Sequence, residues 1–165
     1  MPQIYLAGFD VFRRDAIEQG ARLKQLCQRH GLQGLYPMDN QLPAGLVGQA
    51  AARRIYQDNL RMIADCDAVL ANLEVFRGLE PDSGTAFEVG MAAALGKPVW
   101  GYFSPVADLR ALHGAHRPSV DSLGFVIEDF GLPRNLMLAC SWAGYSATAE
   151  EGVQALAGLL ADRQS

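Results

Sequence analysis

Hydrophobic residues alternate along the chain between short uninterrupted runs and longer segments with helical spacing. Short runs of this kind are typical of strands buried on both faces of a parallel sheet, and they lie at residues 4–7, 35–36, 68–71 and 98–102. The longer segments repeat apolar residues every three or four positions, which predicts helices over residues 13–30, 49–64, 83–95 and 147–163. Strands that alternate with helices indicate a doubly wound α/β fold, and 165 residues suit one domain, 1–165.

The pattern weakens in the second half of the chain. We expect a short fifth strand at residues 125–127 and a helix over residues 132–140, in which Pro133 occupies the first turn. No element is assigned to residues 104–122.

Charge and composition argue against several classes of protein. The formal net charge is −4 and basic residues form no run longer than a pair, so a nucleic-acid surface is not expected. Three well-separated cysteines, Cys27, Cys66 and Cys140, favour a reducing compartment without a disulfide framework. The first residues do not resemble a signal peptide, and no apolar run approaches the ~20 residues that span a bilayer. We therefore expect a cytoplasmic protein without a membrane partner.

Ligands of doubly wound sheets bind beyond the carboxyl ends of the strands. Three loops meet that condition here, at residues 8–12, 37–42 and 72–84. The last of them enters a helix through Asp82, and Glu88 follows inside that helix. The helix N-terminus is expected to keep Glu88 ionised as a nucleophile, and two carboxylates at one cleft suit chemistry at a glycosidic bond. Tyr5, near the end of the first strand, is placed to orient a carboxylate.

Simpler interpretations of these residues stay open from spacing alone. Asp82 could only cap the helix, Glu88 could be solvated, and Tyr5 could be an ordinary core residue. The pair His113 and His116 lacks a cysteine partner, so no metal site is predicted. Dinucleotide and P-loop motifs are absent from the sequence, and no cofactor is expected.

Six segments, in order, resemble the nucleoside 2-deoxyribosyltransferases. They are IYLAG at 4–8, PMDNQ at 37–41, DCDAVLANLEVFRG at 65–78, DSGTAFEVG at 82–90, ALGKPV at 94–99 and GLPRNLML at 131–138. The resemblance implies a flavodoxin-like parallel sheet flanked by helices. It also implies an enzyme that moves 2-deoxyribose between nucleobases through a covalent ester, with 2′-deoxynucleosides and free nucleobases as partners.

The resemblance also implies roles for individual residues. Glu88 matches the nucleophile, Asp82 an acidic residue that contacts and helps protonate the base, and Tyr5 the residue that positions the nucleophile. The substrate-binding residues implied are Gly8, Asp39, Gln41, Asn59, Gly84, Asn135 and Met137. Of these, Asn135 and Met137 match residues lent to a neighbouring subunit, so a homo-oligomer is expected.

One position departs from the family pattern. Some members carry Asp where Asn59 aligns here, and Asp58 stands one residue earlier, about 100° away around the helix. We therefore do not expect position 59 to donate a proton, and we expect Asp82 to supply more of that function.

Two other functions remain as alternatives. A hydrolase of 2′-deoxynucleoside 5′-monophosphates would use the same chemistry with water as acceptor, but Asp10 in the loop at residues 8–14 would repel its phosphate. A non-catalytic nucleotide-binding module would leave Tyr5, Asp82 and Glu88 without a function. The sequence leaves purine and pyrimidine specificity open.

Overall fold

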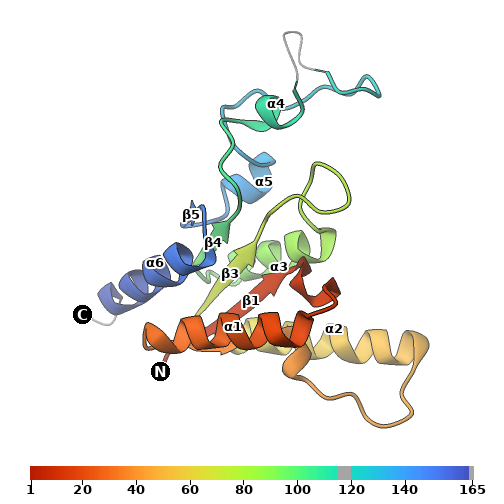
Figure 1. Ribbon diagram of the computed structural model, residues 1–165, viewed down its shortest axis with the longest axis vertical. Coiled ribbons are helices and arrows are strands. Elements are labelled where there is room, and N and C mark those ends of the chain that lie inside the picture. The colour runs from red at the N-terminus through yellow and green to blue at the C-terminus, as the bar shows by residue number, and fades with distance from the viewer. Residues whose placement is uncertain (115–119, 164–165) are drawn as a thin grey trace.

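The computed structural model describes residues 1–114 and 120–163, so His116 lies outside the described residues. Five parallel strands form one sheet in the order β2-β1-β3-β4-β5 (Figure 1). The strands are β1 (Gln3–Gly8), β2 (Gln33–Leu35), β3 (Ala68–Asn72), β4 (Val99–Tyr102) and β5 (Gly144–Ser146). This order reverses between β1 and β3, as in flavodoxin-like folds, and confirms the predicted fold class.

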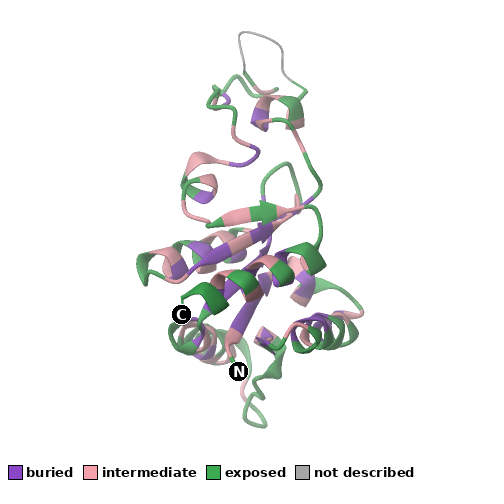
Figure 2. Ribbon diagram, turned by 90° about the vertical axis from the view of Figure 1, so that its left-hand side faces the viewer, coloured by how far each residue is buried: buried purple, intermediate pink, exposed green. Residues whose placement is uncertain are grey.

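Helices cover both faces of the sheet. The long helices are α1 (Ala16–Arg29), α2 (Gly48–Asp65), α3 (Ser83–Ala94) and α6 (Ala149–Asp162), and the short ones are η1 (Phe9–Phe12), η2 (Pro37–Asp39), α4 (Leu109–Leu112) and α5 (Leu136–Ala139). One buried cluster joins α1 and α6 to the sheet, and a second joins α2, α3 and α5 to its other face. Figure 2 shows the central strands largely buried between these layers, whereas the edge strands β2 and β5 are partly exposed.

The central strands follow directly from their sequences. Every residue of β3 is buried, as its continuous apolar run predicted. The pairing of β1 with β3 runs from Ile4 opposite Ala68 to Gly8 opposite Asn72. The carboxyl ends of these two strands therefore lie side by side, and the loops that follow them can share a site.

Two predictions for the second half of the chain were wrong. Residues 125–127 form no strand of the sheet, since Val126 is 85% exposed and takes part only in an isolated bridge with Val120. The fifth strand is instead β5, which pairs with β4. The helix predicted over 132–140 is the single turn α5, because Asn135 caps it and the residues before it, Pro133 included, form bends rather than a helix. In the first half of the chain, the strand predicted at residues 35–36 is β2 (Gln33–Leu35), which ends before Tyr36 because the turn at Pro37 begins there.

The described residues between β4 and α5, 103–114 and 120–135, extend from the carboxyl end of β4 away from the main body (Figure 1). This segment exposes Leu123, Phe125 and Phe130. Within the described residues, no helix is long and apolar enough to cross a membrane.

Candidate active site

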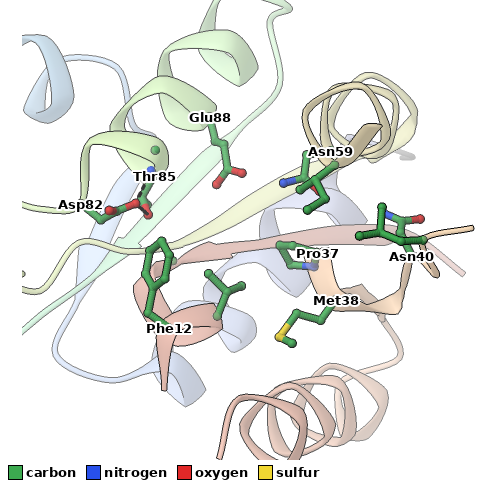
Figure 3. A pocket seen from close by; sticks show the side chains of 13 residues that line it. Phe12, Pro37, Met38, Asn40, Asn59, Asp82, Thr85 and Glu88 are labelled. Atoms are coloured by element: carbon green, nitrogen blue, oxygen red, sulfur yellow. Dashed lines mark hydrogen bonds between the residues drawn. The ribbon is translucent and has the colours of Figure 1, made fainter. Parts of the chain in front are cut away.

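A pocket of about 460 Å³ opens at the carboxyl ends of β1 and β3 (Figure 3). Its walls come from the end of β1, from η1, from the segment after β2, from α2 and from the first turns of α3. The lining residues are Gly8, Val11, Phe12, Pro37, Met38, Asn40, Leu42, Ile55, Asn59, Asp82, Gly84, Thr85 and Glu88. The pocket thus combines an apolar wall with a small number of polar groups, which is typical of sites for small molecules.

Glu88 and Tyr5 form the central polar contact of the site. The Tyr5 hydroxyl donates a hydrogen bond of 2.6 Å to Oε1 of Glu88. Tyr5 itself is fully buried within β1, whereas Glu88 lines the pocket from the second turn of α3. A short bond from a rigid strand residue fixes the direction in which the carboxylate faces.

Burial controls the charge of Glu88. It raises the pKa of the Glu88 carboxyl to about 7, and the negative charge of Asp82 adds to this effect. Hydrogen bonds from Tyr5 and Asn59 act in the opposite direction. Desolvation outweighs these favourable contacts, so the pKa of Glu88 lies above its ordinary value although the residue stands near the helix N-terminus. The carboxyl group changes its charge close to neutral pH.

Asp82 begins α3 and lines the same pocket. Its Oδ2 accepts hydrogen bonds from the backbone N–H of Thr85 at 2.9 Å and from the Thr85 hydroxyl at 3.1 Å. Asp82 is thus the N-cap of the helix, as one interpretation of the sequence held, and it also belongs to the pocket. A structural role as helix cap and a place in the pocket are therefore compatible for Asp82.

Two glycines let the backbone approach the pocket closely. A Cβ atom at Gly8 would lie 2.7 Å from Cβ of Asn72 and 3.1 Å from Oδ2 of Asp10. Gly84, in the first turn of α3, would place a Cβ 3.0 Å from Oδ2 of Asp82. Side chains at either position would therefore displace neighbouring polar groups.

The structure separates Asn59 from its neighbour Asp58. Asn59 lines the pocket and faces Glu88 across it (Figure 3). Asp58 is buried and forms ion pairs with Arg54 and Arg61, and it does not line the pocket. The pocket therefore presents an amide, not a carboxylate, at this position of α2.

The loop after β2 contributes differently from the sequence-based prediction. Asp39 pairs with Lys24 and accepts the backbone N–H of Tyr36, which holds the turn at Pro37. Gln41 is exposed and is not among the lining residues. Met38 and Asn40 line the pocket instead.

Asn135 and Met137 lie apart from Glu88 of the same chain. They line a second pocket of about 300 Å³, together with Ala86 and Gly90 of α3. Ala86 and Gly90 are two positions from Glu88, so they face roughly 160–200° away from it around the helix. Helix α3 therefore separates these two residues from the pocket of their own chain.

The apolar wall consists of residues that were not predicted individually, although most of them lie in two of the predicted loops. Phe12 stacks on Phe76, which stacks in turn on Phe9, and the Arg77 guanidinium lies over the rings of Phe12 and Phe76. Arg77 has a φ of 55°, a conformation that is uncommon for residues other than glycine. The sequence had marked the loops at residues 8–12 and 37–42, which hold most of this wall, and Ile55 lies one helical turn before Asn59.

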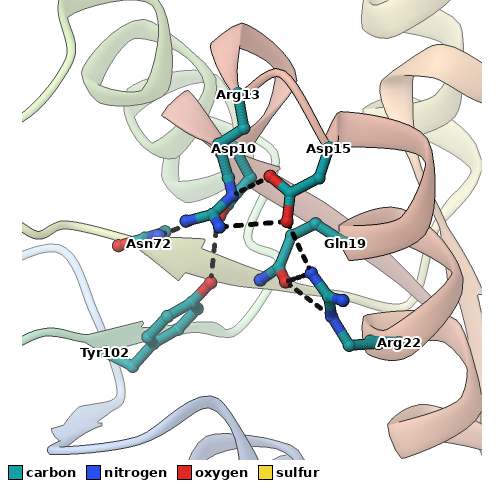
Figure 4. A network of polar contacts seen from close by, with 7 residues as sticks. All are labelled: Asp10, Arg13, Asp15, Gln19, Arg22, Asn72 and Tyr102. Carbon is teal, nitrogen blue, oxygen red and sulfur yellow. Dashed lines mark hydrogen bonds and ion pairs between the residues drawn. The ribbon is translucent and has the colours of Figure 1, made fainter.

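A polar network supports the wall from below (Figure 4). Buried Asp10 accepts hydrogen bonds from Nδ2 of Asn72 at 2.8 Å and from the Tyr102 hydroxyl at 3.4 Å. These contacts tie η1, which carries Phe12, to the ends of β3 and β4. The predicted loop at residues 8–12 therefore has a structural anchor as well as pocket residues.

The fold and this site correspond to a known class of proteins. The sequence profile of the family named nucleoside 2-deoxyribosyltransferase matches residues 4–137, and the chain belongs to that family.

Individual proteins are similar to this chain to different degrees. The structure is similar to that of a 2-deoxyribosyltransferase from Leishmania mexicana, at 33% sequence identity and a TM-score of 0.81, over 96% of this chain and 98% of that one. A CMP N-glycosidase from Clostridium botulinum shares the fold at 15% identity and a TM-score of 0.51, over 93% and 97% of the two chains. An uncharacterised protein of Schizosaccharomyces pombe is 37% identical over 105 residues, which are 62% of this chain and half of that protein's length.

Proposed function

We propose that the chain exchanges nucleobases on 2-deoxyribose, as a nucleoside 2-deoxyribosyltransferase in which Glu88 forms a covalent ester. The observation that carries the proposal is the Glu88 carboxyl group, which Tyr5 holds at 2.6 Å in a pocket sized for a nucleoside. Family membership supports the same chemistry. No metal or organic cofactor takes part in the proposed steps.

The first half-reaction breaks the bond between the sugar and the base. An oxygen of the Glu88 carboxylate attacks C1′ from the face opposite the base, and the C1′–N bond breaks with its electron pair on the base. The departing base takes up a proton by way of Asp82, the other carboxyl group that lines the pocket. Asn59 carries no acidic proton, so Asp82 has this role without help from α2.

The second half-reaction restores the enzyme. A nitrogen of the incoming base attacks C1′ on the face that the first base left, and the ester bond breaks with its electron pair on Glu88. The proton released by the incoming base returns by way of Asp82. Two inversions at C1′ give net retention, as in other double displacements at sugars.

The charge of the pocket favours nucleosides over nucleotides. The unpaired N–H groups of the first turn of α3 are a natural phosphate site, but Asp82 already accepts the N–H of Thr85. Asp10 places a second carboxyl oxygen 3.1 Å from where a Cβ of Gly8 would lie, beside the pocket. Asp10 is buried and does not line the pocket, but its charge lies close enough to Gly8 to disfavour a 5′-phosphate bound there, which argues against the nucleotide hydrolase.

The proposal includes a homo-oligomer in which Asn135 and Met137 complete the site of a neighbouring copy. Helix α3 keeps these residues away from Glu88 of their own chain, and Met137 is 73% exposed. Asp39 and Gln41 do not line the pocket in this structure. The proposal is that their loop brings them to the base once a nucleoside has bound.

Product identity tests the proposal. Deoxyinosine and adenine are incubated with the protein, and we expect deoxyadenosine and hypoxanthine. Free deoxyribose without deoxyadenosine would indicate a hydrolase, and deoxyribose phosphate from the 5′-monophosphate would indicate the nucleotide hydrolase.

Variants at Glu88 test the nucleophile itself. Glu88→Ala should abolish transfer while the fold survives, and Glu18→Ala, on the exposed face of α1, is the matched control. A 2-fluoro deoxynucleoside should add the mass of the fluorosugar to Glu88 in the wild type. Full transfer by Glu88→Ala, or a wild type with neither transfer nor mass increase, would contradict the proposal and favour a binding module.

A further inference from the structure

A guanidinium group is completely buried outside the active-site pocket. Arg134 has 0% exposure and is the largest of the fully buried side chains among the described residues. A buried charge is costly unless its contacts compensate it, and hydrophobic residues of similar volume usually serve stability at least as well. The contacts of Arg134 therefore indicate what the residue is for.

Arg134 joins three separate segments of the chain. Its Nε donates to the carbonyl oxygen of Leu73, just after β3, at 2.9 Å, and its Nη1 donates to the carbonyl oxygen of Pro133 at 2.8 Å. The guanidinium carbon lies 4.0 Å from the ring centre of Phe103, just after β4. Its Nη2 is 3.7 Å from Oε1 of Glu74 and has no hydrogen-bond partner among the described residues.

Glu74 completes the connection to the end of β4. Its Oε2 accepts the backbone N–H of Ser104 at 2.7 Å. The carboxyl ends of β3 and β4 are thus held to each other and, through Arg134, to the segment that enters α5.

The segment that Arg134 anchors carries the two residues proposed to serve another copy of the chain. Asn135 caps α5, because its Oδ1 accepts the N–H of Met137 at 3.0 Å while its Nδ2 donates to Glu128 at 2.6 Å. Helix α5 is a single turn of four residues and is too short to hold its own position. Arg134, directly before Asn135, ties the start of this turn to the rigid sheet, while Leu138 packs in the buried cluster at its other end.

We propose that Arg134 is a positioning residue that sets Asn135 and Met137 for the active site of a second copy of the chain. The inference rests on the proposed function, since it needs a transfer reaction with a shared site. Lysine cannot replace Arg134, because one ammonium group cannot meet the carbonyl of Leu73, the carbonyl of Pro133 and the carboxylate of Glu74 together while also covering Phe103.

The first experiment measures transfer by Arg134→Met and Arg134→Lys, with Arg22→Met on the exposed face of α1 as the matched control. We expect kcat/KM of both Arg134 variants to fall by about 100-fold, the cost of a displacement near 1 Å. The control should match the wild type. Circular dichroism and sedimentation report whether each variant folds and assembles, and Arg134→Lys carries the test if Arg134→Met does not fold.

The second experiment asks in which copy the damage acts. The Arg134 variant keeps its own Glu88, whereas Glu88→Ala keeps Arg134, Asn135 and Met137. Mixed oligomers of the two inactive chains should recover activity, to roughly a quarter of the wild type when copies pair at random in a twofold assembly. If Glu88→Ala does not rescue a folded Arg134 variant, the Arg134 substitution damages the site of the chain that carries it. That result would overturn the inference.

The controls separate the two proposals. A wild type without transfer activity would refute the proposed function before Arg134 is tested. An active wild type together with fully active Arg134→Met and Arg134→Lys would refute the inference alone.

Discussion

One half-buried carboxyl group, that of Glu88, determines much of the behaviour expected of this protein. Glu88 must be ionised to attack a sugar carbon, yet burial raises its pKa to about 7. The Tyr5 hydroxyl opposes this effect, because it donates its hydrogen bond preferentially to the charged form. The ionisation of Glu88 therefore depends on the balance between desolvation, which raises its pKa, and the Tyr5 hydroxyl, which lowers it.

The pH profile of transfer should show this balance. In the wild type, kcat/KM should fall about tenfold per pH unit below a midpoint near 7, where Glu88 becomes protonated. Tyr5→Phe removes a contact that lowers the pKa of Glu88, so its midpoint should move to higher pH and its rate at pH 7 should drop by about tenfold. Initial rates across pH 5–9 measure both quantities. An unchanged midpoint in Tyr5→Phe would show that the hydroxyl does not control the ionisation of Glu88.

The same residue should make stability depend on pH. The folded protein holds the pKa of Glu88 above its ordinary value, so the favourable contribution is present at low pH and is lost as pH rises through about 7. The side-chain amide in Glu88→Gln never ionises. The free energy of unfolding of this variant, relative to that of the wild type, should therefore rise by on the order of 1 to 3 kcal/mol from pH 4 to pH 8. Urea unfolding at the two pH values measures this gain. Glu18→Gln, on an exposed surface, should show none, and a pH-independent difference for Glu88→Gln would contradict the assignment.

Helix α3 combines structural and chemical roles at its first turn. Asp82 caps the helix through Thr85 and also raises the pKa of Glu88 by its charge. Asp82→Asn keeps a capping oxygen but removes the charge, whereas Asp82→Ala removes both.

These two variants should separate the roles. Both should move the acidic limb of the pH profile to lower pH, since each removes the charge that raises the pKa of Glu88. Only Asp82→Ala should lose about 1 kcal/mol of stability, the usual value of a helix cap. Rates across pH and unfolding in urea provide the two measurements. Equal stability losses in both variants would indicate that the charge, not the cap, stabilises α3.

The elements that hold Glu88 and Tyr5 were predictable because their patterns are local. The buried runs at 4–7 and 68–71 and the helix after Asp82 agree with β1, β3 and α3. Strand β5 was not predictable, because Gly144–Ser146 has only three residues and depends on pairing with β4. Residues 125–127 carry the stronger apolar signal but have no neighbouring strand to join.

Prediction of the site reached the residues with chemical side chains and missed those that shape the space around them. Glu88, Asp82 and Asn59 line the pocket together, and Tyr5 lies behind Glu88. The wall formed by Phe12 depends on ring stacking with Phe76, a residue 64 positions away, which no local pattern reports. The anchoring by Arg134 is equally invisible in sequence, because a single arginine usually indicates a solvated surface.

At the scale of the whole molecule, one chain does not contain everything that the proposed site needs. Asn135 and Met137 lie across α3 from Glu88, and the segment around them exposes Phe125, Phe130 and Met137. Exposed apolar residues gathered on an extended segment are typical of an interface between chains. The proposed activity should therefore belong to the assembly rather than to the isolated chain.

Dilution tests that expectation without any substitution. Activity per chain should stay constant at high protein concentration and fall as the assembly dissociates, in parallel with particle mass measured by light scattering. Saturating deoxynucleoside should shift both curves to lower concentration by the same factor, because substrate that touches two copies stabilises their contact. A monomeric particle with undiminished activity per chain would show that Asn135 and Met137 act in no second site, and the pocket beside Glu88 would then be complete by itself.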